Sequence, residues 1–242
     1  MKISLTLAAL AAVLVPAAPA LADTAPPAAA AGPVLVARYT FDGGAVAGRV
    51  ADSSGRSPAL TVRTADQGVI RFQGGYAAFP AACPSGAAAC PRGLLEAAND
   101  ADLNPGTRFF RWSARVNVTK AQLAGSSNVL QKGVNNTGSQ WKMQIGATNG
   151  KAQCVVVGAG SSVTYLVRSS ATVADGVWHK LTCQRSGTTL SVWVDNVQRG
   201  QATIPSTLSM SNSLPLRIGG PNFNARSDMY HGLLDDVYAE LG

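Results

Sequence analysis

The chain has 242 residues, a formal net charge of +7 and a hydrophobic fraction of 46%. A single β-rich domain is ordinary at this length and can bury a core without help from a metal. The basic residues are scattered rather than gathered in runs, which argues against nucleic-acid binding but leaves room for a mild attraction to acidic polymers.

Residues 1–22 have the layout of a secretory signal peptide. Lys2 supplies a positive charge, an apolar run extends to Pro16, and the sequence ALA ending at Ala22 offers a small-residue cleavage site. The apolar run is too short to span a membrane, and no later segment reaches about 18 consecutive apolar residues. We therefore expect cleavage after Ala22, a secreted, extracellular protein, and no transmembrane segment.

Residues 23–33 read DTAPPAAAAGP and are rich in alanine and proline. Such a segment cannot bury a core, and we interpret it as a linker. Residues 34–242 then form one domain.

Short β-rich runs separated by Gly, Asn, Asp or Pro recur through this domain, a pattern typical of an antiparallel sandwich or jelly roll. Only LLEAAND, at residues 94–100, has a helical period. The runs are, in chain order, VLVARYTF, ALTVR, VIRFQ, YAAF, FFRWSARVNV, NVLQKG, QWKMQIG, KAQCVVV, VTYLVRS, VWHKLTCQRS, LSVWVD, PLRIGG and LLDDVYAEL.

The run TLSVWVDN shows the alternation of a half-buried strand. Leu190, Val192 and Val194 fall on one face, and Trp193 falls on the other. The dipeptide at 195–196 is Asp-Asn, and both residue types tolerate a positive φ, so we expect a two-residue hairpin turn there.

Four cysteines follow the predicted signal peptide, and an even number in an exported chain indicates disulfides. Of the three possible connectivities we favour Cys83–Cys90, which brackets a short loop, together with Cys154–Cys183, which joins two predicted strands. A zinc site would need closer cysteine spacing.

The order of several segments resembles the laminin G-like domain of the concanavalin A-like lectin/glucanase superfamily, especially its secreted actinobacterial members. The segments are ARYTFDGG, DSSGRSPAL, LNPGTRFFRWSARVNV, NVLQKG, WKMQIG, DGVWHKLTCQRSGTTLSVWVDN, PLRIGG and YHGLLDDVYAEL. The resemblance implies an all-β, two-sheet antiparallel jelly-roll sandwich with a curved face. It also implies extracellular recognition of carbohydrate or protein more often than catalysis.

The residues give little support to an enzyme. Glycoside hydrolysis needs two carboxylates across the scissile bond, whereas the two glutamates, Glu96 and Glu240, lie far apart in the sequence. Asp235 and Asp236 are adjacent and would face opposite sides of a strand. We expect no catalytic residues, with a glycoside hydrolase-like activity as the weaker alternative. His179 lies in a predicted strand without a partner motif, and we interpret it as structural.

A structural calcium is the one cofactor that the resemblance implies. In such domains an acidic residue of the last strand joins the N-terminal strand, and Asp235 and Asp42 match those two positions. Calcium takes six to eight oxygen ligands. The alternative is a solvated strand end and a turn aspartate.

Sugar sites combine aromatic faces with planar polar groups. Two segments offer that combination, the strand–loop–strand at 131–141 and the long polar loop at 219–231, where function tends to reside. The candidate ligand-binding residues are Gln131, Lys132, Asn135, Trp141, Asn222, Asn224, Asp228 and Tyr230.

The sequence therefore predicts a secreted, non-catalytic recognition module that binds a glycan through rim loops or the curved sheet face. The alternative is an adhesion or structural domain that binds a protein or a cell-wall polymer.

Overall fold

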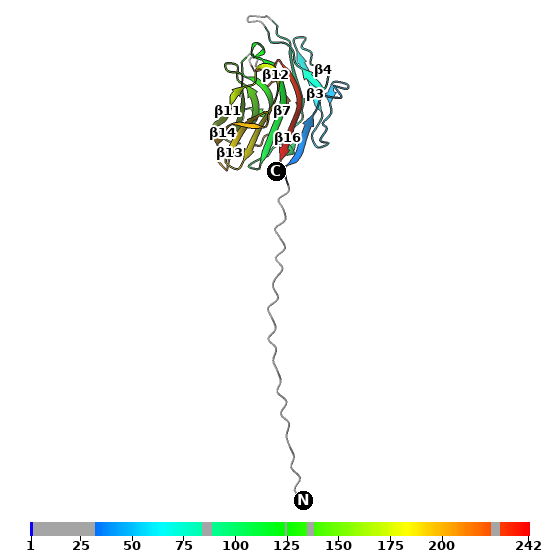
Figure 1. Ribbon diagram of the computed structural model, residues 1–242. Helices are drawn as coiled ribbons and strands as arrows, with labels where there is room; N and C mark the ends of the chain where they lie inside the picture. Colours follow the sequence, from blue (N-terminus) through cyan, green and yellow to red (C-terminus); the bar gives the residue numbers. More distant parts are fainter. Residues whose placement is uncertain (2–31, 84–88, 124, 135–137, 224–227) are drawn as a thin grey trace. The chain divides into compact units, whose positions relative to one another are not determined.

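A computed structural model describes residues 1, 32–83, 89–123, 125–134, 138–223 and 228–242. Residues 32–242 form one compact unit of two antiparallel sheets (Figure 1). The predicted signal peptide and linker lie almost wholly outside the described residues.

The first sheet, here called sheet A, contains the first and last strands of the chain side by side (Figure 1). Its strands, in spatial order, are β14 (Val197–Thr203), β13 (Thr189–Val194), β12 (Asp175–Ser186), β7 (Phe110–Thr119), β16 (Leu233–Leu241), β5 (Tyr76–Ala78) and β4 (Arg71–Gln73), with β1 (Val34–Tyr39) also paired to β16.

Within the described residues, the second sheet, sheet B, has eight strands and ends in a two-residue strand. Its spatial order is β11 (Thr164–Thr172), β10 (Lys151–Val157), β9 (Ser139–Ile145), β8 (Ser127–Val134), β15 (Leu216–Ile218), β6 (Arg92–Ala97), β3 (Leu60–Ala65) and β2 (Arg49–Val50). Two short 3-10 helices, η1 (Ala101–Leu103) and η2 (Lys120–Gln122), lie in connections.

The all-β, two-sheet prediction is confirmed, and one local expectation is corrected. The segment with a helical period contains Leu94 and Leu95, which lie in strand β6 between β3 and β15. Pairing on both edges of β6 overrides the weak helical period, because a central strand satisfies every backbone group through its neighbours.

An aromatic cluster ties the two sheets together. Phe110 and Trp112 come from β7 in sheet A, and Trp141 comes from β9 in sheet B. The Trp141 ring centroid lies 5.1 Å from that of Phe110 and 5.7 Å from that of Trp112. All three side chains are buried, so this cluster forms the centre of the core.

Both predicted disulfides are confirmed. Cys154 on β10 is bonded to Cys183 on β12, which joins sheet B to sheet A through the core. Cys83 is bonded to Cys90 across the short loop before β6. The predicted hairpin turn is also present, because Asp195 and Asn196 have φ values of 52° and 64°.

Candidate functional site

The outer face of sheet B carries a row of polar side chains that points away from the core. In β9, Trp141, Met143 and Ile145 belong to the core. Gln140, Lys142 and Gln144 alternate with them and therefore face outward. A strand placed centrally in a sheet thus presents a polar row to one side and a packed row to the other.

Strand register aligns these outward residues into rows that cross the sheet. Val155 of β10 pairs with Lys142, Lys142 with Gln131 of β8, Gln131 with Arg217 of β15, and Arg217 with Glu96 of β6. Directly opposed residues lie on the same face of a sheet. One continuous row therefore runs across five strands.

Two adjoining hollows lie over this face, with volumes of about 280 Å³ and about 350 Å³. Gln144 and Leu166 line both hollows, which makes them parts of one groove. We call it the sheet B groove. Its other polar lining residues include Asn128, Gln131, Gln140, Lys142, Gln153, Arg168 and Asp228.

Amide side chains in the groove hold one another in place. Asn128 Nδ2 donates to Gln131 Oε1 at 2.7 Å, and Gln144 Nε2 donates to Gln153 Oε1 at 2.6 Å. Within the described residues, Asn128 Oδ1 and Gln144 Oε1 are buried without a hydrogen-bond partner. Asn128 and Gln144 are directly opposed across β8 and β9. The groove therefore contains two neighbouring carbonyl oxygens that still need donors.

Among the described residues, Lys142 is one of two cationic side chains that line the groove, and Arg168 is the other. Burial lowers the pKa of the Lys142 ammonium, and the nearby Asp228 carboxylate partly offsets that effect. A main-chain hydrogen bond also joins Asp228 to β8, because Asn128 N donates to the Asp228 carbonyl oxygen at 3.0 Å. The predicted residues Gln131 and Asp228 thus share one groove.

A third hollow of about 210 Å³ lies farther along the same face, and Asn222 and Phe223 line it together with Glu96 and Arg217. Arg92 fixes this part of the loop, since its guanidinium donates to the Phe223 carbonyl oxygen and lies 5.5 Å from the Phe223 ring centroid. Asn222 is therefore near the row but outside the sheet B groove. Asn135 and Asn224 lie outside the described residues.

Three candidate ligand-binding residues are instead part of the folded interior. Trp141 is 1% exposed and its indole donates to the Leu103 carbonyl oxygen at 3.0 Å. Tyr230 is 1% exposed, with its hydroxyl donating to the Leu233 carbonyl oxygen at 2.9 Å. Neither ring has a face open to a sugar, which corrects the expectation for both.

Lys132 is the third of these residues. It is fully buried, and its ammonium donates to Asn104 Oδ1 at 2.7 Å and to the Asn212 carbonyl oxygen at 2.6 Å. Burial lowers its pKa to about 8. The ammonium also donates to Asn212 Oδ1 at 3.2 Å, so Lys132 fixes two connecting loops and has no donor free for a ligand. Lys132 is the direct partner of Trp141 and therefore lies on the core-facing side of β8.

The two candidate calcium ligands lie close enough to interact electrostatically. Burial raises the pKa of Asp235, and its neighbours Asp236 and Asp42 add to that effect. Asp235 Oδ2 accepts a hydrogen bond from Arg115 at 2.9 Å. No group of three or more His, Cys, Asp or Glu side chains converges in the described part of the chain. These two carboxylates supply fewer oxygens than calcium takes, so calcium stays a prediction without added support.

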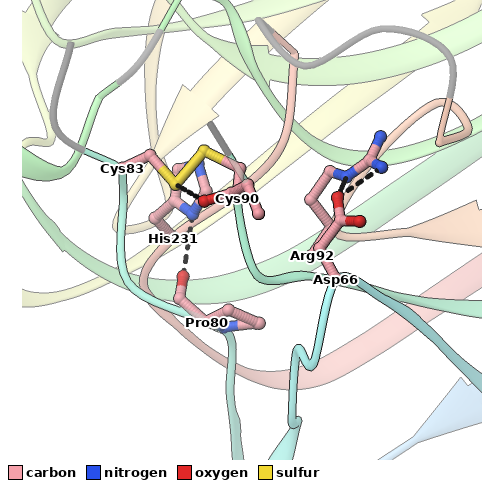
Figure 2. The surroundings of a disulfide bond; sticks show 7 residues. Asp66, Pro80, Cys83, Cys90, Arg92 and His231 are labelled. Atoms are coloured by element: carbon pink, nitrogen blue, oxygen red, sulfur yellow. Dashed lines mark hydrogen bonds and ion pairs between the residues drawn. A yellow bond between two sulfur atoms is a disulfide. The ribbon is translucent and has the colours of Figure 1, made fainter. Parts of the chain in front are cut away.

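The Cys83–Cys90 bond lies beside a buried histidine (Figure 2). His231 is 6% exposed, and its Nδ1 donates to the Pro80 carbonyl oxygen at 2.8 Å. Burial lowers the pKa of His231, which keeps the ring neutral. Nearby, Arg92 is paired with Asp66 (Figure 2). This disulfide region anchors the end of the long polar loop rather than offering a reactive group.

His179 lies between two carboxylates on the rim of sheet A. Its Nδ1 is 2.7 Å from Asp195 Oδ2 and its Nε2 is 3.1 Å from Asp175 Oδ1. Only the imidazolium donates from both nitrogens. Burial alone would lower the pKa of His179, but the hydrogen bonds to the two aspartates outweigh it and raise the pKa. His179 thus links β12 to the turn between β13 and β14, which agrees with the prediction that this histidine is structural.

We expect His179→Gln to lower the free energy of unfolding by about 0.5–1 kcal/mol near pH 6. The contribution of His179 is fully present below its unfolded pKa of about 6.5 and is lost as the pH rises through the higher folded pKa. Urea unfolding at several pH values measures this difference between the two proteins. A difference that grows above pH 8 would contradict a stabilising link through the charged histidine.

Within the described residues, no helix is long and apolar enough to cross a bilayer.

Comparisons with known proteins identify structures of the same fold. No curated protein matches the chain. Domain 4 of AbnA, a GH43 extracellular arabinanase from Geobacillus stearothermophilus solved in complex with arabinotriose, is similar at a TM-score of 0.65 and 14% identity, covering 87% of this chain and 93% of that one.

Toxin binding domains have the same fold. The binding domain of botulinum neurotoxin serotype C1 gives a TM-score of 0.60 at 11% identity, covering 85% of this chain, and the chain spans 48% of that domain. The binding domain of Paraclostridial Mosquitocidal Protein 1 gives 0.59 at 12% identity, with coverage of 85% and 48%. A sequence profile described as the concanavalin A-like lectin/glucanases superfamily, of laminin G type, matches residues 96–239. The chain therefore belongs to the concanavalin A-like lectin/glucanases superfamily.

Proposed function

We propose that this domain is a secreted, non-catalytic carbohydrate-recognition module that binds a neutral glycan in the sheet B groove. One observation carries the proposal. Asn128 Oδ1 and Gln144 Oε1 lie on directly opposed residues, and both are buried acceptors without a donor among the described residues. Sugar hydroxyls are donors, and a buried acceptor left unpaired costs about 1–3 kcal/mol.

The rest of the groove complements a sugar ring. The Lys142 ammonium is a donor for ring or hydroxyl oxygens, and Val155, Leu166 and Pro221 supply apolar patches for its C–H groups. No aromatic side chain lines the groove within the described residues. Binding therefore depends on hydrogen bonds to the amides, and we expect modest affinity and strong selectivity for hydroxyl geometry.

The glutamate of this face, Glu96, supports recognition rather than hydrolysis. Glu96 accepts hydrogen bonds from Arg217 and Arg63. Burial would raise the pKa of Glu96, but the two arginines outweigh it and lower the pKa. A general acid in glycoside hydrolysis needs a raised pKa, so Glu96 is poorly suited to that role.

The extracellular location rests on the predicted signal peptide and on the two disulfides, which persist in oxidising compartments. The arabinanase domain was solved with arabinotriose, and this makes arabinan oligosaccharides a reasonable first probe. Binding to a protein or to a cell-wall polymer instead of a free glycan is a separate outcome of the same test.

The test is calorimetric titration of arabinotriose and a panel of neutral oligosaccharides into the intact domain. We expect at least one oligosaccharide to bind. Gln144→Ala should weaken that binding about five- to tenfold, because it removes one hydrogen bond to the ligand and the hydrogen bond that holds Gln153 in place. Gln198→Ala removes an exposed amide of β14 on the other sheet and should leave binding unchanged.

Failure of every neutral glycan to bind, or equal affinity of the wild type and Gln144→Ala, would overturn the proposal. Retention on purified cell wall that free sugars do not compete away would favour the polymer-binding alternative. Release of reducing ends from any bound glycan would contradict the non-catalytic part of the proposal.

A further inference from the structure

The outer face of sheet A has a hollow of its own, on the side of the sandwich opposite the sheet B groove. Its volume is about 230 Å³, and neighbouring strands β7, β12, β13 and β16 form it. Its lining includes Arg111, Lys180, Thr182, Gln184, Trp193 and Tyr238. Here, unlike in the sheet B groove, two aromatic side chains border the space.

Strand register explains why this hollow exists. Trp193 pairs with Thr182, Thr182 with Ser113, and Ser113 with Tyr238, so these four residues form one row across the sheet. Three strand spacings separate the two aromatic residues, or about 14 Å. Two small side chains lie between two large ones, which leaves a trough with an aromatic residue at each end.

The charges around the trough leave one cation without a carboxylate. Arg111 Nη1 is paired with Glu240 Oε2 at 2.8 Å, and its other nitrogens donate to Gln184 Oε1. The Lys180 ammonium lies 5.4 Å from the Tyr238 ring centroid, and it has no ion pair among the described residues. An ammonium over an aromatic ring keeps hydrogen-bonding capacity for a ligand anion.

One donor at the other end of the trough is also unsatisfied. Trp193 Nε1 is buried and has no acceptor in the described part of the chain. Lys180 is two residues from Thr182, the direct partner of Trp193, which makes it a diagonal neighbour of Trp193. Diagonal neighbours lie about 7–8 Å apart at the backbone, and the Lys180 ammonium lies over Tyr238, so one ligand that spans the trough contacts both groups.

We propose that this trough is a second ligand site, which binds a carboxylate-bearing (uronic acid-containing) oligosaccharide. The carboxylate accepts a hydrogen bond from the Lys180 ammonium beside Tyr238, and a hydroxyl oxygen of a neighbouring sugar unit accepts one from the Trp193 indole N–H at the other end of the trough. The Trp193 and Tyr238 rings pack against sugar C–H groups. One uncompensated positive charge matches one carboxylate. The Glu240 carboxylate neutralises Arg111 and would repel further negative charge, so the trough disfavours a densely charged ligand such as a multiply sulfated chain.

The site is distinct from the proposed glycan groove in position and in ligand charge. The trough on sheet A and the sheet B groove share no lining residue. Either one can fail without the other, because the sheet B groove is tested with neutral sugars and with Gln144→Ala.

The test titrates trigalacturonate and its fully methyl-esterified counterpart into the intact domain at low salt, with calorimetry and with the indole N–H signals in NMR spectra. Methyl esterification keeps the shape of the oligosaccharide and removes the negative charges of its carboxylates. We expect the free acid to bind at least tenfold more tightly than the ester and to shift the Trp193 indole N–H signal. Added salt should weaken the binding of the acid.

Two variants locate the site. Lys180→Gln keeps a polar side chain and should weaken binding of trigalacturonate about tenfold, and Trp193→Phe keeps a ring but loses the N–H and should weaken it severalfold. Gln144→Ala should bind as the wild type does. Equal binding of acid and ester, an unshifted Trp193 signal, or full affinity in Lys180→Gln would overturn the proposal.

Discussion

Replacing Trp141 with alanine should lower the free energy of unfolding by about 3–5 kcal/mol, as expected for removing a large aromatic side chain from a core. The indole is 1% exposed and packs against Phe110 and Trp112 across the two sheets. Its N–H also donates to the Leu103 carbonyl oxygen, and that buried acceptor would lose its donor. Both effects act in the same direction.

Urea unfolding followed by circular dichroism measures this loss. Trp193→Ala is the matched control, because Trp193 lies on the outer face of sheet A and is only partly buried. We expect the control to lose less than half as much stability as Trp141→Ala. Equal losses in the two variants would contradict the assignment of Trp141 to the core.

The sequence predicted those features that depend on local alternation. Leu190, Val192 and Val194 were expected on one face of their strand, and all three belong to the core. The turn residues Asp195 and Asn196 have the positive φ values that their residue types suggested. A two-residue period and a turn signal lie within one stretch of chain, so no long-range information is needed.

The same two-residue alternation indicates that Trp141 faces the core, although that inference was not drawn from the sequence. Met143 and Ile145 follow it at two-residue spacing, and such a row of large apolar residues indicates the buried side of a strand. The polar partners in that run, Gln140 and Gln144, were the better candidates for a ligand surface. Aromatic residues suit both cores and sugar sites, and their neighbours at that spacing decide between the two.

The central pair of the groove depends on register, which the sequence does not show. Asn128 is opposed to Gln144 only because the pairing of β8 with β9 shifts between Asn128 and Leu130. A shift of one residue would turn one of these side chains to the other face. Strand β14 was also missed, because VQRGQAT is a mostly exposed edge strand without apolar alternation.

Removing the bond between Cys154 and Cys183 should have the other large effect on stability. Their sequence separation is 29, and closing a loop of that length in the unfolded chain gives about 3–4 kcal/mol of stabilisation in the chain-entropy account. Both cysteines are fully buried in the core. The double variant Cys154→Ala, Cys183→Ala therefore also leaves unfilled space between the sheets, which adds to the loss.

The second disulfide provides the control. Cys83 and Cys90 are separated by 7 residues, for which the same account gives only about 2–3 kcal/mol, and the bond lies in a loop beside His231 rather than between the sheets. Urea unfolding of the two double alanine variants should therefore rank Cys154/Cys183 as the more destabilised. The opposite ranking would mean that the loop before β6, and not the covalent link between the sheets, limits the stability of the sandwich.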